Sequence, residues 1–106
     1  MNPTAQELYD QFKLIESNYG ALFQACTSEA QREQLRACYN QAWSNYNIAI
    51  NKTFDQNDPR VAQLSKQLSD EGQQIQNALK GLQNISSAMN TISSVVSLGT
   101  SLVLAV

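Results

Sequence analysis

Apolar side chains recur at helical spacing through the first half of the chain. Within residues 5–25 they fall three and four positions apart, and the same rhythm returns within residues 29–53. Apolar positions with that period lie along one face of an α-helix, and no stretch shows the alternation of period two that is typical of a strand. The pattern predicts an all-α chain that opens with an antiparallel helical hairpin.

The second half of the chain carries a heptad repeat. Counted from Val61, the repeat defines two seams, and twelve of their fourteen positions are apolar; the exceptions are Glu71 and Gly99. An unbroken register of this length is typical of a helix that packs along its whole length, as in a coiled coil. The register therefore favours one long helix over residues 59–106.

Gly81 supports a different arrangement. It follows Lys80, and a basic residue before a glycine is typical of a helix end. A break at Gly81 would give four helices of similar length, which is an up-down four-helix bundle. The long helix is preferred because the heptad register passes through Gly81 without a shift, and either arrangement makes residues 1–106 a single helical domain.

Capping side chains mark three helix starts. Thr4 with Glu7, and Ser28 with Gln31, have the spacing of capping boxes, in which a hydroxyl and a polar side chain three residues later satisfy free amides. Asp58 stands before a proline, which is tolerated at the first position of a helix because its missing N–H has no partner there. These signals agree with helices over about 5–25, 29–53 and 59–106.

The C-terminal tail, residues 88–106, is apolar and uncharged. The seven Lys or Arg and the nine Asp or Glu residues of the chain all precede Gly81. Such a tail needs to be covered by an oligomer, by a helical partner, by the chain's own core or by a membrane. Its 19 residues just span a hydrocarbon core of about 30 Å, so membrane insertion is an alternative.

Composition limits the available chemistry. The chain has no histidine and no glycine-rich phosphate loop, and its net charge of −2 is of the wrong sign for a nucleic-acid partner. Asp70 and Glu71 are adjacent on a helix and face different directions, so they do not form a catalytic pair. The sequence predicts a non-enzymatic protein with no catalytic residue, metal site or cofactor.

The helically spaced aromatic residues are expected in the core rather than on a ligand-stacking surface; they are Tyr9, Tyr19, Tyr39, Trp43 and Tyr46.

Two cysteines lie in the predicted second helix and just before it. Cys26 and Cys38 are separated by eleven residues, and Trp43, the pair Ile50–Asn51 and Phe54 follow. If the second helix begins at about residue 28, Cys38 lies about 15 Å along it, which is too far for a disulfide with Cys26. The two side chains then act as small buried residues of a reduced protein, which would be cytoplasmic.

Residues 26–54 nevertheless resemble the LprI-type lysozyme-inhibitor module of bacteria. Members of that family have a cysteine pair at this spacing and an aromatic residue five positions after the second cysteine, where this chain has Trp43. The chain departs from the family at Asn47, where aspartate is usual, and its first residues do not have the pattern of a signal peptide. The resemblance implies a disulfide between Cys26 and Cys38, an envelope or secreted location, and inhibition of a lysozyme-type enzyme.

The uncharged C-terminal helix is the basis of the functional prediction. We expect a helical interaction or assembly protein that self-associates or docks a partner through this helix, with membrane insertion through 88–106 and LprI-like inhibition as alternatives. The residues predicted to carry the interaction come from both seams of the heptad repeat, and together we call them the interaction seam; they are Ile85, Met89, Ile92, Val96 and Val103.

Overall fold

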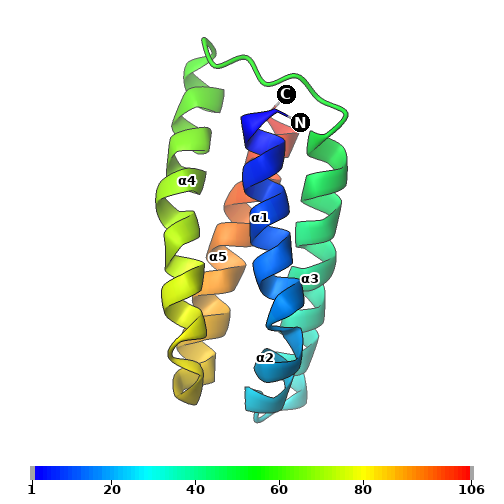
Figure 1. Cartoon of the computed structure of the whole chain (residues 1–106), viewed down its shortest axis with the longest axis vertical. Helices are drawn as coiled ribbons and strands as arrows, with labels where there is room; N and C mark the ends of the chain where they lie inside the picture. The colour runs from blue at the N-terminus through cyan, green and yellow to red at the C-terminus, as the bar shows by residue number, and fades with distance from the viewer. Residues whose placement is uncertain (1, 106) are drawn as a thin grey trace.

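The computed structural model describes residues 2–105, which are helical apart from their turns and contain no strand. The all-α class is therefore confirmed. The helices are α1 (Pro3–Ser17), α2 (Tyr19–Ala25), α3 (Glu29–Ala49), α4 (Pro59–Leu79) and α5 (Ile85–Leu104), with a 3₁₀ turn at Leu82–Asn84 (Figure 1).

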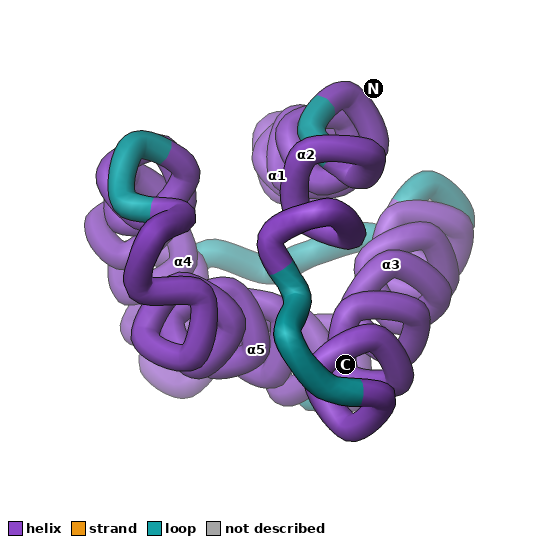
Figure 2. Tube along the Cα trace, turned by 90° about the horizontal axis from the view of Figure 1, so that it is seen from below, coloured by secondary structure: helices purple, strands orange, loops and turns teal. Residues whose placement is uncertain are grey.

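The four long helices form a bundle with a crossed connection. They run alternately down and up, and both chain ends lie at the same end of the bundle (Figure 1). Both α1 and α5 pack against α3 and against α4, so α3 and α4 occupy opposite corners (Figure 2). The loop over residues 50–58 crosses that diagonal. As a result α1 runs parallel to α4, and α3 runs parallel to α5.

The prediction of one continuous helix over 59–106 is wrong, because the chain reverses its direction between α4 and α5. Helix α4 ends at Leu79, and Gly81 leads into the 3₁₀ turn with a negative φ of −121°. The Asn84 side chain then accepts a hydrogen bond from the Ser87 amide at 3.4 Å and caps α5. The heptad register passes through the turn because both helices present their apolar seams to the same core. A repeat of apolar positions is therefore the same whether or not the chain reverses its direction.

The predicted first helix is also divided. At Asn18 the side-chain amide donates to the Leu14 carbonyl at 2.8 Å, and the chain continues as the short helix α2. A side chain that bonds to the backbone four residues earlier competes with the helical hydrogen bonds and favours a break. The second predicted helix ends at Ala49 rather than at residue 53.

Capping follows the prediction at two of three starts. Ser28 caps α3 and Asp58 caps α4, through the Gln31 amide at 3.2 Å and the Arg60 amide at 2.9 Å respectively. At α1 the prediction is wrong, because Asn2 rather than Thr4 caps the helix; Asn2 Oδ1 accepts from the Ala5 amide at 2.7 Å.

The core runs along the axis of the bundle and receives side chains from all five helices. Three polar side chains within residues 2–105 are also buried, and the least exposed of them is Asn45, at 1%. Its Nδ2 donates to the Val96 carbonyl at 3.1 Å, its Oδ1 accepts from Gln41 Nε2 at 2.9 Å, and the Thr100 hydroxyl lies 3.2 Å from the same oxygen. Both polar atoms of the Asn45 side chain are therefore hydrogen-bonded, and the bonds to Val96 and Thr100 tie α3 to α5. The largest fully buried apolar side chains are Leu8, Ile15, Leu22, Leu35, Leu68, Ile75, Met89, Ile92 and Leu102.

Gly99 allows α5 to approach its neighbours closely. A Cβ atom at this position would lie 2.9 Å from Leu8 Cδ2 and 3.1 Å from Asn45 Nδ2. Both distances are shorter than ordinary van der Waals contacts, and both neighbours are buried. The apparent weak point of the heptad seam is thus a position where only a hydrogen atom fits.

Candidate functional site

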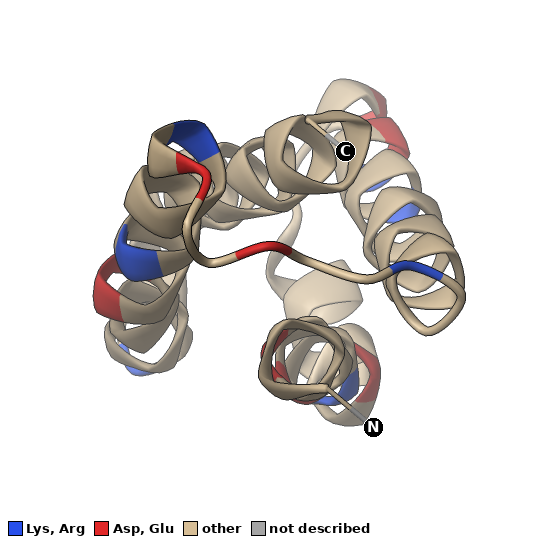
Figure 3. Cartoon of the chain, turned by 90° about the horizontal axis from the view of Figure 1, so that it is seen from above, with Lys and Arg blue, Asp and Glu red and all other residues tan. Residues whose placement is uncertain are grey.

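The predicted interaction seam lies inside the chain's own core. Its five side chains are all buried and belong to the core cluster; they are Ile85, Met89, Ile92, Val96 and Val103. They pack between α3 and α4, and the outer face of α5 carries mainly serine, threonine and asparagine and no charge (Figure 3). Docking through this seam stays a prediction, and it would require the bundle to open.

The segment Leu82–Leu104 is long and apolar enough to cross a membrane, with a mean hydropathy of 1.3 over its best window. Length and composition carry little weight here, because the core helix of a soluble bundle meets the same criterion. Of that window, 44% is buried within the bundle. Insertion through residues 88–106 therefore stays a prediction as well.

The two cysteines do not form the disulfide that the LprI resemblance implies. Both thiols are free and buried. Cys26 follows the end of α2 and its Sγ donates to the Leu22 carbonyl at 3.2 Å, whereas Cys38 lies on α3 with its Sγ 3.2 Å from Ser93 Oγ on α5. Helix α3 is straight from Glu29 onward, which places Cys38 about 13 Å along its axis. Burial raises the pKa of the Cys38 thiol, and the hydrogen bond with Ser93 only partly offsets this effect. Neither thiol has the exposed, electropositive surroundings of a reactive cysteine.

Seven aromatic rings form a continuous row along α1, α2 and α3. We call this row the aromatic face; its members are Tyr9, Phe12, Tyr19, Phe23, Tyr39, Trp43 and Tyr46. Neighbouring ring centroids are 5.1–6.4 Å apart, and five of the six pairs are tilted or edge-on. This geometry is favourable because the positive edge of one ring meets the negative face of the next.

The aromatic face is only partly covered by the chain. Trp43 is 48% exposed and Phe23 is 39% exposed, and the four tyrosines are half-buried, while Phe12 is buried beneath them. The expectation that these rings lie in the core is therefore wrong for Trp43. Trp43 is exposed because the aromatic face lies on an outer wall of the bundle, formed by α1 and α3. The row of rings is wider than the part of this wall that faces the core.

Polar and charged side chains border one end of the aromatic face. A cavity of about 430 Å³ opens beside two of the rings and is lined by Glu16, Tyr19, Arg36, Tyr39 and Asn40. The Tyr39 hydroxyl donates to Glu16 Oε2 at 3.4 Å, and Lys13 Nζ lies 2.6 Å from Glu16 Oε1. This hydrogen bond from Lys13 lowers the pKa of Glu16.

The remaining charges beside the face are also paired. Glu29 forms ion pairs with Arg36 at 2.7 Å and with Arg32 at 3.2 Å, and Arg36 also pairs with Glu33. The two arginines lower the pKa of Glu29, and the Arg32 guanidinium lies 5.7 Å from the centre of the Phe23 ring. The pairs are solvent-exposed, so each contributes little to stability. Their effect is to leave the border of the aromatic face close to neutral.

No match to this chain is found among models of protein families, curated proteins or solved structures. The LprI resemblance stays a prediction, without the disulfide that it implied. Within residues 2–105 no group of three or more acidic, cysteine or histidine side chains could hold a metal ion. The aromatic face is the principal candidate site in the described part of the chain.

Proposed function

We propose that this protein is a non-enzymatic docking module that binds a helix of another protein along the aromatic face. The observation that supports this proposal is the row of seven rings on an outer wall of the bundle, with Trp43 and Phe23 partly exposed. Docking along the aromatic face needs no change in the bundle, whereas docking through the α5 seam would expose five buried side chains.

Residue type favours a protein partner. Tryptophan, tyrosine and arginine are enriched among residues that dominate binding energy, because they combine a large contact area with a polar group that can hydrogen-bond. The aromatic face contains tryptophan and tyrosine, and Arg32 and Arg36 lie at its border. Its tyrosines are also rigid, so little conformational entropy is lost when a partner covers them.

The shape and charge of the aromatic face favour a helix with an apolar stripe. The rings form a narrow row parallel to the bundle axis, and an amphipathic helix presents apolar side chains in a row of the same kind. The cations at the border, Lys13, Arg32 and Arg36, are already paired with carboxylates. Since no net charge is available to attract the partner, we expect binding to depend weakly on salt concentration.

Replacing Trp43 by alanine is expected to weaken partner binding at least thirtyfold, as the loss of a central hot-spot side chain does. Trp43 is the only tryptophan of the chain, so its fluorescence also reports the contact directly. The measurement is capture of partner from extract by immobilised wild type and variants, followed by calorimetric titration of each with the captured protein; tryptophan emission is a second signal only for the chains that keep Trp43.

The matched control is Leu104→Ala, which removes an exposed apolar side chain at the end of α5, away from the aromatic face. The proposal requires that Leu104→Ala binds the partner as tightly as wild type does, and that the affinity of both is the same in 50 mM and 500 mM salt. Trp43→Ala and Phe23→Ala are required to bind more weakly than wild type. Equal binding by Trp43→Ala would contradict it. If the captured protein is a second copy of this chain, the helical-partner assignment is wrong.

A further inference from the structure

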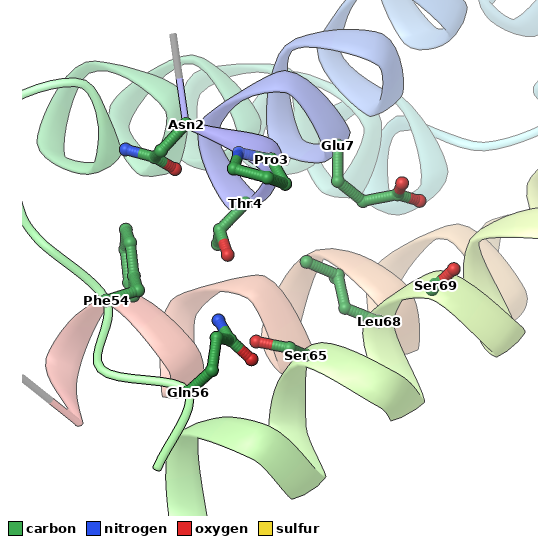
Figure 4. A pocket seen from close by; sticks show the side chains of 9 residues that line it. All are labelled: Asn2, Pro3, Thr4, Glu7, Phe54, Gln56, Ser65, Leu68 and Ser69. Carbon is green, nitrogen blue, oxygen red and sulfur yellow. The ribbon is translucent and has the colours of Figure 1, made fainter. Parts of the chain in front are cut away.

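A second cavity lies on another side of the bundle, between α1 and α4. Its volume is about 430 Å³, and the loop that crosses from α3 to α4 closes one end of it (Figure 4). It is lined by Asn2, Pro3, Thr4, Glu7, Phe54, Gln56, Ser65, Leu68 and Ser69. This volume lies within the range of pockets that hold small ligands.

The cavity exists because small and polar residues face one another across α1 and α4. Helix α4 turns Ser65, Ser69 and Gly72 toward α1. A Cβ atom at Gly72 would lie 3.1 Å from Glu7 Oε1 and 3.4 Å from Gln11 Nε2. Large apolar side chains would close such a gap, as they do between α4 and α5.

Two buried polar atoms near the cavity have no partner. Ser65 Oγ, on the cavity wall, and Gln11 Nε2, one turn beyond Glu7, are buried and make no hydrogen bond in the described part of the chain. Gln11 is 4% exposed. A buried polar group without a partner is costly, and in native proteins it often marks a place where water or a ligand completes the hydrogen bonds.

The charge of the cavity is negative and unbalanced. Glu7 makes no ion pair within residues 2–105, and no lysine or arginine lines the cavity. Burial, and secondarily Asp10 on the same helix, raise the pKa of Glu7. The residues of α4 and of the loop that line the cavity carry no charge, so none of them stabilises the carboxylate.

We propose that this cavity binds a small organic cation with a protonated amine, and that the ammonium group lies against the Glu7 carboxylate. In Figure 4 the hydroxyls of Thr4 and Ser65, the amide of Gln56 and the Phe54 ring lie at the end of the cavity that the loop closes, away from the Glu7 carboxylate, so they face the remainder of the ligand rather than its ammonium group. This inference is independent of the docking proposal.

Other ligand classes fit less well. An anion would meet Glu7 and no cation, and the N-terminus of α1 is already capped by Asn2, so its amides do not form an anion site. A neutral polyol would satisfy the hydroxyls but would leave the partly buried carboxylate without a counter-charge. A cation supplies the counter-charge that the Glu7 carboxylate lacks among the residues that line the cavity.

The test is titration of the ¹⁵N-labelled protein with butylammonium chloride at pH 7.5, monitored by amide chemical shifts. We expect saturable shifts at Thr4, Glu7 and Ser65 with a Kd on the order of 1 mM. Butanol and sodium butyrate are the matched neutral and anionic probes, and we expect at least tenfold weaker binding of each. Equal binding of butanol, or no saturable shift with butylammonium, would overturn the proposal.

Glu7→Gln and Asp10→Asn form the matched pair of variants. Glu7→Gln keeps the shape and removes the charge, so we expect at least a tenfold loss of butylammonium affinity. Asp10 is exposed and does not line the cavity, so Asp10→Asn is expected to bind within twofold of wild type. The affinity of wild type falls as the pH is lowered through the pKa of Glu7, and this pH dependence is absent in Glu7→Gln. Unchanged affinity in a folded Glu7→Gln would remove Glu7 from the site.

Discussion

Replacing Ile92 by alanine is expected to lower the free energy of unfolding by about 2–5 kcal/mol, the range found when a large apolar side chain is removed from a core. Ile92 is fully buried at the centre of α5. Truncation there leaves a cavity, because α3 and α4, the helices that pack on both sides of α5, cannot move in to fill it. Urea unfolding followed by circular dichroism measures the loss, and the midpoint is expected to be the same at 2 µM and 100 µM protein.

The control for Ile92→Ala is Leu104→Ala on the same helix. Leu104 is 73% exposed, so its truncation is expected to change stability by less than about 0.5 kcal/mol. A midpoint that rises with protein concentration, or equal effects of the two substitutions, would show that the seam is covered by another molecule. The interpretation of α5 as a wall of the chain's own core would then be wrong.

Adding one methyl group at Gly99 is expected to be destabilising. In Gly99→Ala the new Cβ lies against Leu8 and Asn45, which are both buried, and Asn45 is fixed by its hydrogen bonds to α3 and α5. Since both neighbours are buried and would have to shift, we expect a loss of about 1–3 kcal/mol, as in other overpacked cores. Thermal or urea unfolding measures it.

Gly20→Ala is the matched control for Gly99→Ala, because it adds the same methyl group at a position where space is available. No atom lies within 4 Å of the position that its Cβ would take, and the residue lies in the first turn of α2. The lower entropy of the unfolded chain is expected to raise stability by about 0.4–1 kcal/mol. The two substitutions should therefore have opposite signs; a stabilising Gly99→Ala would refute the close approach of α5.

Local signals predicted the local structure well. The apolar period identified the all-α class, and Ser28 and Asp58 marked the starts of α3 and α4, because capping depends on a few adjacent residues. The end of α4 was less clear. Its signal at Gly81 was present, but the longer heptad pattern pointed to a continuous helix, and a pattern of apolar positions is the same for one helix and for two antiparallel helices that share a core.

The arrangement of the helices could not be predicted from these signals. That α3 and α4 lie on a diagonal follows from packing between distant segments, as does the burial of the α5 seam. The aromatic spacing was visible in the sequence, yet spacing alone does not tell a core stripe from one on an outer wall. Likewise, Gln11 and Glu7 gave no signal of a cavity, because it depends on Ser65 and Gly72 across the bundle.

The apolar helix α5 is covered by its own chain. Amide hydrogen exchange of α5, measured at 1 µM and again at 100 µM, tests it most directly, because exchange in a core helix reports the global opening of the fold. We predict equal protection at both concentrations, with the amides of Met89, Ile92 and Val96 among the slowest of the chain. Protection that is lost on dilution, while α1 and α3 remain protected, would contradict the account.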